Sequence, residues 1–480
     1  MDSKTRFSVG KDLLCCVISV CLIAAALEFT SFAQAAPLPD AAKPGAVHPR
    51  QKTTIPSTRK LPKLIIPSVM QRPLNTAGGA KIEVRNFVIK GAQDYPDLGI
   101  KVSDIRVIVA HAIKQYPAGL TIGQLQLVAD KISTYYRKKG FILAHAFVPE
   151  QTVEGGVVKF SVLEGVLGQV MVEGNKRYSK KLIRRPFIDL IGKPIIKNSI
   201  ESSLLTLMDY PGISVTGMFA PGTKVGTANL TIKVEGEKRV ASGLSLNNYG
   251  SEYVGEYQLT GDFTLNNVTK AADSLSVSVM KSFDPDLMWY TSLTYKRPLS
   301  KRYYLGLEGS LDNFDVGKEL EPLKLKGKTR VASAYVQRVF KKSRKSNLKA
   351  TVRLSSKLSE TKNSTSTINK DKLTVVSIGL SGNRIVDFWK GGIDLFNLEY
   401  SRGIGSFLGS MDSTGAQQSS RRGGSGERAG AGFNKIQLDY SHLQRLGDNF
   451  SALVRLQTQW SDDMLVALEQ FPLGGPNSVR

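Results

Sequence analysis

The stretch EYQLTGDFTLNN, residues 256–267, alternates between apolar and polar side chains. Successive side chains of an extended chain point to opposite faces, so this alternation predicts a β-strand with one apolar face and one polar face. A strand of about ten residues with these faces suits a barrel that has lipid outside and water inside, and it also suits one wall of a soluble sandwich. The apolar face carries Tyr257, Leu259, Phe263 and Leu265, and the polar face carries Gln258, Thr260, Asp262 and Thr264.

The same alternation recurs along the rest of the chain after Glu237. It is clearest in the stretches SLSVSV (274–279), NLKATVRL (347–354), KIQLDY (435–440) and FSALVRLQTQW (450–460). On this basis we predict about eleven strands. They are expected to begin near residues 239, 255, 273, 287, 303, 328, 346, 371, 391, 433 and 449.

The connections between these strands alternate between short and long. The short ones are NVTKAA, RPLSKR, KKSRKS, DFWKGG and RLGD. The long ones are 315–328, the Ser/Thr/Lys-rich stretch around 357–371 and the Gly/Ser/Arg-rich stretch 404–432. Short turns on one side and long loops on the other are typical of an outer-membrane barrel, whereas a soluble sandwich does not require them. We therefore predict a transmembrane antiparallel β-barrel over 237–480.

Residues 80–236 show helical spacing between extended segments. In the first half, a strand is predicted at 82–91, helices at 104–116 and 121–140, and a β-hairpin at 141–149 and 156–165. The second half repeats this order, with strands at 166–175, 213–219 and 228–236 and helices at 179–192 and 198–210. Such internal repetition predicts two tandem β-α-α-β-β units, 80–165 and 166–236.

The N-terminal residues lack this order. Three basic residues precede an apolar run over 13–27, and the small-residue triplet Ala-Gln-Ala follows at 33–35, which predicts a secretory signal peptide over 1–35. All three cysteines lie inside that segment, so the exported chain is expected to have no disulfide and no cysteine metal site. Residues 36–79 are rich in Pro, Lys and Arg, which predicts an extended, solvated linker.

Charge and motifs exclude several function classes. The chain has 65 Lys+Arg against 41 Asp+Glu, a net charge of +24, but the basic residues are spread along its length. We see no recognition helix and no RNA-binding signature, so we expect no nucleic-acid partner. The barrel is expected to contact outer-membrane lipid, and basic residues of the long loops, such as Arg421 and Arg422, either contact lipopolysaccharide phosphates or form a solvated positive face, which is the favoured alternative. The four histidines lack metal-ligand spacing, and no G-x-S-x-G or phosphate-cradling motif occurs. We expect no catalytic residue, no metal and no cofactor.

Three stretches resemble the two-partner secretion transporters of the haemolysin/haemagglutinin secretion-activation family, and the resemblance covers residue 80 to the end. YYRKKGFILAHAFVPEQTVEGGVVKFSVLEG (135–165) is similar to the close of the family's first polypeptide-transport-associated (POTRA) domain. NNYGSEYVGEYQ (247–258) is similar to its first barrel hairpin, and FPLGGPNSVR (471–480) to its inward-folded pore loop, which carries a Val-Arg-Gly-aromatic motif. The residues that carry the motifs are Gly140, Phe141, Gln151, Glu164 and Gly165, then Asn248, Gly250 and Gly255, and finally Val479 and Arg480.

The resemblance implies an outer-membrane pore of a Gram-negative bacterium with two POTRA domains in the periplasm. Such a pore recognises one large secreted partner, an adhesin or haemolysin-like exoprotein, and translocates it unfolded and without ATP. POTRA domains of this kind are thought to bind the partner at a sheet edge or a helix–strand groove. A general barrel-assembly factor of the same superfamily is an alternative, as is a passive porin or adhesion barrel, although a porin would not need the tandem α+β units.

The resemblance also implies that the sequence is truncated at its C-terminus. The family's barrel has sixteen strands, and the pore loop follows the eleventh. Closed single-chain bacterial barrels normally have an even number of strands. Eleven strands would leave two edges in lipid, where each unpaired backbone group costs several kcal/mol. We therefore expect that the chain at this length does not insert as a working pore.

Two further expectations concern the linker and the basic residues. Relatives in this family often have a pore-plugging helix before the first POTRA domain, but prolines over 37–78 argue for a tether instead. The resemblance implies that Arg480 would pair with an acidic residue on a later strand. The basic turn KKSRKS (341–346) is expected to attract an acidic substrate through long-range electrostatics.

Overall fold

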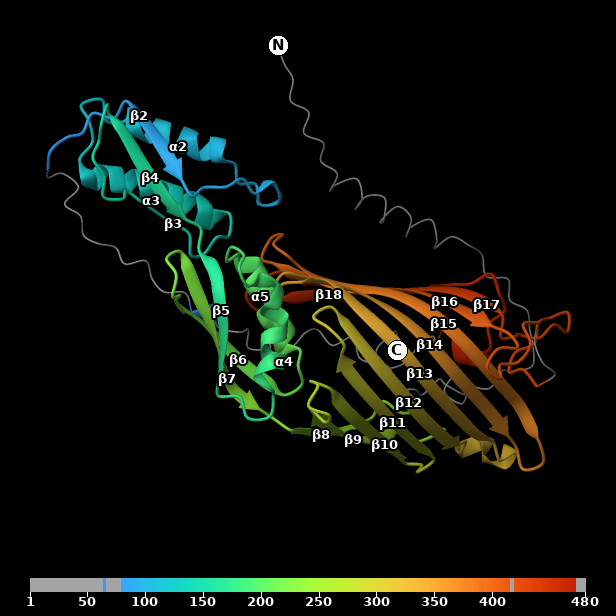
Figure 1. Ribbon diagram of the computed structural model, residues 1–480. Coiled ribbons are helices and arrows are strands. Elements are labelled where there is room, and N and C mark those ends of the chain that lie inside the picture. Colours follow the sequence, from blue (N-terminus) through green and yellow to red (C-terminus); the bar gives the residue numbers. More distant parts are fainter. Residues whose placement is uncertain (1–63, 66–78, 415–417, 472–480) are drawn as a thin grey trace, which may run out of the picture. The chain divides into compact units, whose positions relative to one another are not determined.

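The computed structural model describes residues 64–65, 79–414 and 418–471 (Figure 1). Two α+β units, here called the first unit and the second unit, precede an antiparallel sheet of eleven strands. This order confirms the predicted fold class. The predicted signal peptide over 1–35 lies outside the described residues, and no helix among the described residues is long and apolar enough to cross a membrane.

The first unit places two helices beside a three-stranded sheet. The strands have the order β2-β4-β3, in which β2 and β4 are parallel and β3 and β4 antiparallel. A capping box between Thr121 and Gln124 explains where the second helix begins, because two backbone N–H groups of its first turn are satisfied by side chains. The elements are β2 (Asn86–Lys90), the 3-10 turn η3 (Pro96–Leu98), α2 (Val102–Lys114), α3 (Ile122–Lys138), β3 (His145–Phe147) and β4 (Val157–Leu163).

The second unit repeats this topology, with β5 and β7 parallel and β6 and β7 antiparallel. The helix predicted over 179–192 differs in its second half, which is a 3-10 helix. Pro186 stands at the start of that half, and proline lacks the backbone N–H that an α-helix would use there. The elements are β5 (Val166–Glu173), α4 (Lys180–Arg184), η4 (Arg185–Leu190), α5 (Lys197–Met208), β6 (Ile213–Pro221) and β7 (Thr227–Glu237).

Each unit has its own hydrophobic core. In the first unit, Ile105 and Val109 of α2 and Ile132 of α3 pack with Phe160 of β4, and all four are fully buried. Apolar residues at i, i+4 and i+7 spacing on the helices meet the alternate residues of the strand, so both periods bury one face. The second unit has an equivalent core around Phe187, Leu204, Leu230 and Ile232.

Two residues of the interval predicted as a solvated linker form a strand. Leu64–Ile65, labelled β1, pairs in parallel with Gly217 and Met218 of β6 and extends the sheet to the order β1-β6-β7-β5. Leu64 also packs against the core of the second unit. The prediction of a fully solvated tether is therefore wrong at this point, because an aliphatic pair in an extended segment satisfies an open sheet edge.

The large sheet is an uninterrupted antiparallel series from β8 to β18. Each strand pairs with its neighbours in sequence, and among the described residues β8 and β18 each have one neighbour. The strands are β8 (Val240–Asn247), β9 (Tyr257–Asn266), β10 (Ser274–Phe283), β11 (Met288–Pro298), β12 (Tyr303–Asp315), β13 (Lys326–Lys342), β14 (Ser346–Lys362), β15 (Thr367–Val386), β16 (Gly392–Ile404), β17 (Phe433–Arg445) and β18 (Ser451–Trp460), with 3-10 turns η5 (Lys318–Leu323) and η6 (Ala467–Glu469).

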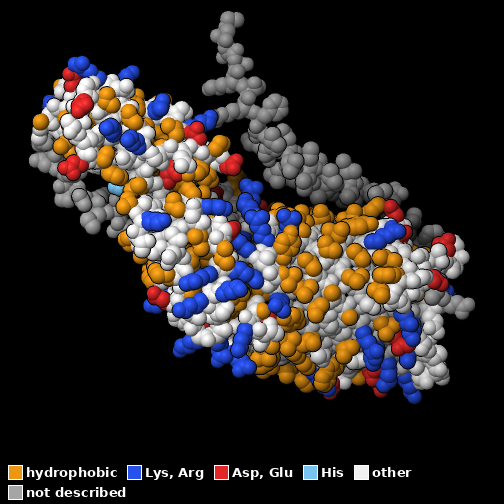
Figure 2. Space-filling view, in the orientation of Figure 1, with side chains coloured by type: hydrophobic (Ala, Val, Ile, Leu, Met, Phe, Trp, Pro, Cys, Tyr) orange, Lys and Arg blue, Asp and Glu red, His pale blue; other side chains and the backbone are white. Residues whose placement is uncertain are grey.

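The two faces of this sheet differ as the alternation predicts. Large apolar side chains such as Phe263, Leu307 and Ile378 are exposed on the outer face, over which hydrophobic side chains gather in Figure 2. On the other face polar side chains meet across strands, for example Ser333 Oγ and Ser355 Oγ at 3.0 Å. A sheet with these faces fits lipid outside and a polar lumen inside.

The predicted long loop around 357–371 is wrong. Strands β14 and β15 continue through it to a tight turn at 363–366, where Asn363 Oδ1 accepts hydrogen bonds from the N–H groups of Thr365 and Ser366. The 20 residues of β15 extend for about 66 Å at 3.3 Å per residue, far more than the about 25 Å apolar band of a barrel. The hairpin therefore projects beyond the membrane, where an apolar face is not needed and the alternation fades.

Candidate functional site

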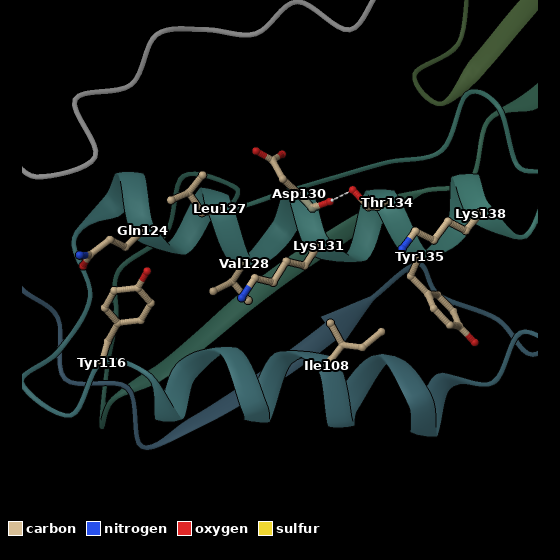
Figure 3. A pocket seen from close by; sticks show the side chains of 10 residues that line it. All are labelled: Ile108, Tyr116, Gln124, Leu127, Val128, Asp130, Lys131, Thr134, Tyr135 and Lys138. Carbon is tan, nitrogen blue, oxygen red and sulfur yellow. Dashed lines mark hydrogen bonds between the residues drawn. The ribbon is translucent and has the colours of Figure 1, made fainter.

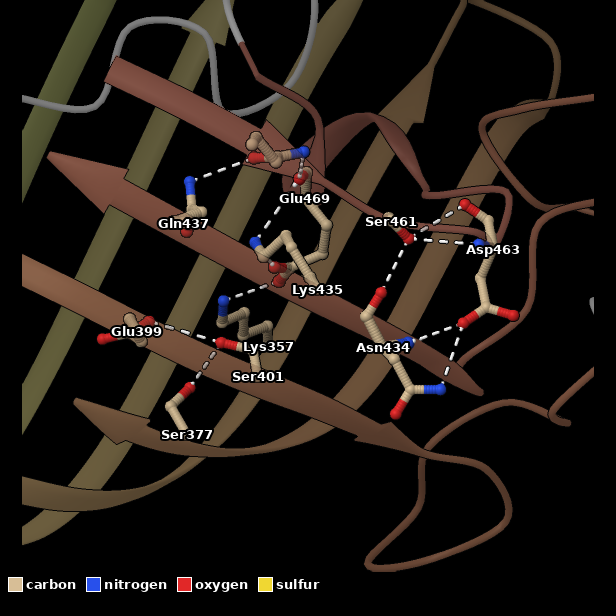
Figure 4. A network of polar contacts seen from close by, with 11 residues as sticks. Lys357, Ser377, Glu399, Ser401, Asn434, Lys435, Gln437, Ser461, Asp463 and Glu469 are labelled. Carbon is tan, nitrogen blue, oxygen red and sulfur yellow. Dashed lines mark hydrogen bonds and ion pairs between the residues drawn. The ribbon is translucent and has the colours of Figure 1, made fainter. Parts of the chain in front are cut away.

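A buried ion cluster fixes the segment 461–471 that follows β18. The Glu469 side chain is 1 % exposed, and its carboxylate lies 2.5 Å from Lys435 Nζ and 2.6 Å from Lys357 Nζ (Figure 4). Lys435 belongs to β17 and Lys357 to β14, two strands that are separated by β15 and β16. One carboxylate from a loop therefore ties together two strands that do not touch each other.

The two lysines keep the Glu469 side chain ionised. Burial by itself would raise the pKa of the Glu469 carboxyl, but the charges of Lys357 and Lys435 and their hydrogen bonds outweigh burial and lower that pKa to about 2. The carboxylate is consequently ionised throughout the physiological range. Two positive charges surround one negative charge, so the lysines depend on Glu469 more than Glu469 depends on either lysine.

The same segment has polar and apolar supports besides the ion cluster. The Gln459 side chain donates to the Glu469 carbonyl at 3.1 Å, and the Ala467 N–H donates to Ser420 Oγ at 3.0 Å. Val466 is fully buried in a small core. That core also contains Leu373, Val375, Ala429, Ala431, Phe433 and Leu465, and so joins the segment to the long connection after β16.

The residues predicted to carry the pore-loop motif, Val479 and Arg480, lie outside the described residues. Of the predicted loop 471–480, Phe471 alone is among the described residues, and the segment 461–471 leads into that loop from β18. Sequence reasoning missed Glu469 and its two lysines. A usable signal was present, because Lys357 and Lys435 are charged residues on the lumen face of alternating strands, where they need a partner.

Glu164 is the centre of a hydrogen-bond cluster in the first unit. Its carboxylate accepts from Tyr95 Oη, from Tyr136 Oη at 3.0 Å and from the Gln93 N–H at 3.1 Å. Burial, together with the nearby Glu164 charge, raises the pKa of both tyrosines. Phe141 is fully buried, with its ring centroid 5.1 Å from that of Tyr95 and 5.4 Å from that of Tyr136. This cluster joins the end of β4 to α3.

Two motif glycines lie at the junction of the units. Gly140 (φ +98°) accepts a hydrogen bond from the Lys197 N–H at 2.9 Å, and Gly165 (φ +78°) accepts one from the Ile195 N–H at 2.8 Å. Any side chain at Gly165 would begin 2.9 Å from Leu143 Cβ, so only glycine fits. The two carbonyls attach the first unit to the start of α5.

The side chain of Gln151 pairs with the backbone of β4 in the way that a residue of a neighbouring strand would. Its side chain accepts from the Lys159 N–H at 2.7 Å and donates to the Lys159 carbonyl at 2.9 Å. β3 ends at Phe147, so the side-chain amide continues the ladder beside β4 after the strand itself has stopped. Each predicted POTRA motif residue thus makes structural contacts within the first unit or at its junction with the second.

The first-hairpin residues form a tight loop between β8 and β9. The Gly250 N–H donates to the Glu256 carbonyl at 3.0 Å, and Gly255 has φ +118°. A Cβ on Gly255 would lie 2.4 Å from Ser282 Cβ, which excludes larger residues. Asn248 is exposed, and the side chain that supports the loop is that of Asn247, whose Oδ1 accepts from the Tyr249 N–H at 3.0 Å.

The edge of β6 contains a socket for an aliphatic side chain. A Cβ on Gly217 would lie 3.3 Å from Leu64 Cδ1 and 3.4 Å from Leu204 Cδ1. The missing side chain therefore makes room for Leu64 between β6 and α5. Among the described residues, β1 pairs with only two of the nine residues of β6 and no other strand pairs on that side. This pairing shows that the edge of β6 accepts an extended chain in parallel orientation.

A groove of about 520 Å³ lies between α2 and α3 of the first unit (Figure 3). Leu127, which is 43 % exposed, and Ile108 provide apolar surface within it, while Asp130 and Lys131 supply charge. The other residues that line it are Tyr116, Gln124, Val128, Thr134, Tyr135 and Lys138. The periodicity predicted both helices but not that their outer sides leave this hollow.

The basic turn over 341–346 has acidic partners within the protein. Lys342 Nζ lies 2.6 Å from Asp209 Oδ2 at the end of α5, and Arg344 Nε lies 3.2 Å from Glu201 Oε1. The expected attraction of an acidic substrate by this turn is weakened accordingly, because two of its positive charges are already neutralised. These pairs instead attach the second unit to the sheet.

Comparison with known proteins adds two family matches. A family model described as "Haemolysin secretion/activation protein ShlB/FhaC/HecB" matches residues 226–480, and one described as "POTRA domain, ShlB-type" matches residues 97–165. The first match covers more than half of the chain. The second lies within the first unit and includes Tyr136 and Glu164 of the hydrogen-bond cluster.

Individual relatives are distant but extensive. "Heme/hemopexin transporter protein HuxB" of Haemophilus influenzae (strain 86-028NP) is 26% identical over 384 residues, which are 78% of this chain and 65% of that protein. "Outer membrane transporter CdiB" of Dickeya dadantii (strain 3937) is 25% identical over 377 residues, 74% of this chain and 62% of that protein. The chain thus spans less than two thirds of the length of either relative.

Among solved structures, CdiB from Escherichia coli superposes with a TM-score of 0.65 at 23% identity and covers 87% of this chain and 74% of its own. CdiB from Acinetobacter baumannii gives a TM-score of 0.55 at 18% identity, covering 100% of this chain and 82% of its own. These likenesses agree with the order of α+β units and antiparallel sheet described above.

Proposed function

The chain belongs to the haemolysin secretion/activation family ShlB/FhaC/HecB, and from this premise we propose that it translocates one large secreted polypeptide across the outer membrane. Family members are transporters of the outer membrane of Gram-negative bacteria, with the POTRA units on the periplasmic side. In this proposal the partner is an unfolded adhesin or haemolysin-like exoprotein, and its folding outside the cell supplies the drive without ATP.

The observation that carries the proposal is the segment 461–471, clamped to the inside of the sheet through Glu469. A segment anchored on the lumen face of the sheet reduces the space for free diffusion, which favours a transporter over an open passive pore. The proposed domains are the signal peptide (1–35), the linker (36–79), the POTRA units (80–165 and 166–236) and the barrel segment (237–480). The exposed apolar strand faces would contact outer-membrane lipid, and the surrounding Lys and Arg would contact lipopolysaccharide phosphates.

We infer that the partner is recognised at the edge of β6. Backbone pairing with a sheet edge accepts many sequences, while the socket at Gly217, which Leu64 fills in this structure, would take an aliphatic side chain of the partner once the partner displaces Leu64. The linker residues Leu64–Ile65 show which chemistry the edge accepts, namely an extended segment in parallel orientation. An unfolded exoprotein offers many such segments, and a folded protein offers few.

The experiment that tests the function is secretion from the native locus. The gene and its neighbouring exoprotein gene are expressed in a heterologous Gram-negative host, and exoprotein in the medium or on the cell surface is measured against a periplasmic lysis marker. We expect export only when both genes are present. Equal export without the transporter gene, or continued retention in the periplasm with it, would contradict the proposal.

The edge itself is tested by Gly217→Val, which fills the socket. We expect secretion to fall at least about tenfold while the amount of assembled protein in the outer membrane is unchanged. Gly243→Val on β8 is the matched control, because a Cβ there meets nothing within 4 Å. Normal secretion by the Gly217 variant would place recognition elsewhere, with the groove between α2 and α3 as the next candidate.

A further inference from the structure

The segment 461–471 is held by a charge arrangement that is unusual inside a protein. Glu469 is 2 % exposed and Lys435 is 6 % exposed, so both ions have lost nearly all contact with water. Moving ions out of water is costly unless the geometry and the hydrogen bonds are good. Here both Nζ–carboxylate distances are short, and Lys435 Nζ also donates to the Glu469 carbonyl at 3.4 Å.

Neutralising Glu469 should release the segment more than removing either lysine. If Glu469 is neutralised, two buried lysines that shared one counter-ion are left together, and both desolvation and mutual repulsion then favour releasing the segment into water. If one lysine is removed, a one-to-one pair remains. The loss of Lys435 should matter more than the loss of Lys357, because their side chains are 7 % and 22 % exposed.

We propose that Glu469 is the positioning residue of the segment 461–471 that leads into the predicted pore loop, and that it holds this segment against the lumen face of the sheet by bridging β14 and β17. This inference rests on the proposed function for its role in transport, but the clamp can be measured without any transport. This clamp, the contact of Glu469 with Lys357 and Lys435, holds the segment 461–471 next to β18, and all three of its residues are described. It is therefore separate from the pairing that the family resemblance implies for Arg480.

The clamp also determines what else is held in place. Val466, three residues before Glu469, is packed beside Ala429 and Ala431 of the long connection after β16. The Ala467 N–H is bonded to Ser420 in that same connection, and the Ser420 N–H donates to Asp371 Oδ1 at 3.0 Å. Release of Glu469 should thus loosen the loop and uncover Val466 to water that fills the lumen.

A single-thiol experiment measures this release. The sequence has cysteines only at 15, 16 and 21, so Val466→Cys in a background with those three changed to Ala introduces its only thiol. The protein is assembled in outer membranes from its complete gene, because eleven strands alone are not expected to insert, and its reaction with a small water-soluble methanethiosulfonate is followed in time. We expect Glu469→Gln to speed the labelling at least about tenfold. The matched control is Glu308→Gln, which breaks the ion pair of Glu308 with Arg353 on β14 and should leave the rate unchanged.

Further variants keep the test decisive if Glu469→Gln fails to assemble. Lys435→Met should give a smaller increase than Glu469→Gln, and Lys357→Met the smallest. The charge-free triple variant Lys357→Met/Lys435→Met/Glu469→Leu should regain much of the protection, because apolar residues of similar size can replace a buried ion cluster. Labelling of Lys435→Met at the parent rate, or equal acceleration by Glu308→Gln, would overturn the proposal. Failed secretion by the protein made from its complete gene would refute the proposed function and leave this result standing.

Discussion

Substitution of Glu164 by Ala should destabilise the first unit more than any other single removal of a charge there. The carboxylate accepts three hydrogen bonds, from Tyr95, Tyr136 and the backbone of Gln93. A hydrogen bond to a charged group contributes about 1.5–3 kcal/mol, and less where water reaches it. Tyr136 is fully buried, so its hydroxyl would be left without an acceptor. We expect a loss of about 3–5 kcal/mol, a large part of the usual 5–15 kcal/mol of a domain.

Amide hydrogen exchange in the full chain, held in outer membranes, measures this loss. Each 1.4 kcal/mol corresponds to a tenfold change in an equilibrium constant, so amides of α3 and β4 should exchange about 10²- to 4 × 10³-fold faster, while amides of the β14–β15 hairpin should not change. Glu164→Gln keeps one acceptor oxygen and should cost about half as much. Glu150→Ala, at an exposed site of the same unit, serves as the control. An acceleration below about fivefold for Glu164→Ala would refute the assignment of this cluster as the support of the unit.

Other consequences can be measured on the same material. Gly255→Ala places a Cβ against Ser282 at a backbone φ of +118°, so the heat-modifiable assembled form should fall several-fold, whereas Gly447→Ala, where a Cβ meets nothing within 4 Å, should assemble normally. Leu64→Asp should release the linker from β6, which would appear as faster protease cleavage within residues 36–79 and not elsewhere. Protection of Cys at position 466, expressed relative to an exposed reference thiol at the same pH, should be constant from pH 7 to pH 5. The pKa of Glu469 is lowered, so its contribution is fully present above the ordinary carboxyl pKa and is lost as pH falls from there through about 2; a loss of protection near pH 6 would contradict the proposed role of Glu469.

Much of the fold could be predicted because its signals are local. β14 begins at residue 346 as predicted, and β9 begins at 257 where 255 was expected. In a membrane sheet one face of each strand meets lipid and the other meets water, so residues are alternately apolar and polar along the strand. The helices α2 and α3 could be found for the same reason, since their buried side chains recur at the helical period. The error at 357–371 has a matching cause, because outside the membrane both faces of the hairpin meet water.

The site could not be predicted because its contacts join residues that are far apart in the sequence. Glu469 lies 112 residues from Lys357 and 34 from Lys435 along the chain, and nothing near any of the three identifies the other two. Leu64 and Gly217 are also far apart in the sequence. Only the packed sheet shows that Gly217, which has no side chain, leaves room for Leu64. Likewise Gln151 was predicted as a motif residue, but its role beside Lys159 became visible only where β3 stops short.

The sequence by itself determined the order of the two α+β units, the number and phase of the antiparallel strands, and which strand faces are apolar, because these depend on the solvent that each residue meets. Only the tertiary structure decided which lumen charges are neutralised, which sheet edge is occupied by the linker, and how the loop after β18 is held. Those outcomes depend on distances between residues far apart in the chain, and the energy of an ion pair or of a packed side chain depends on such distances within a few ångströms.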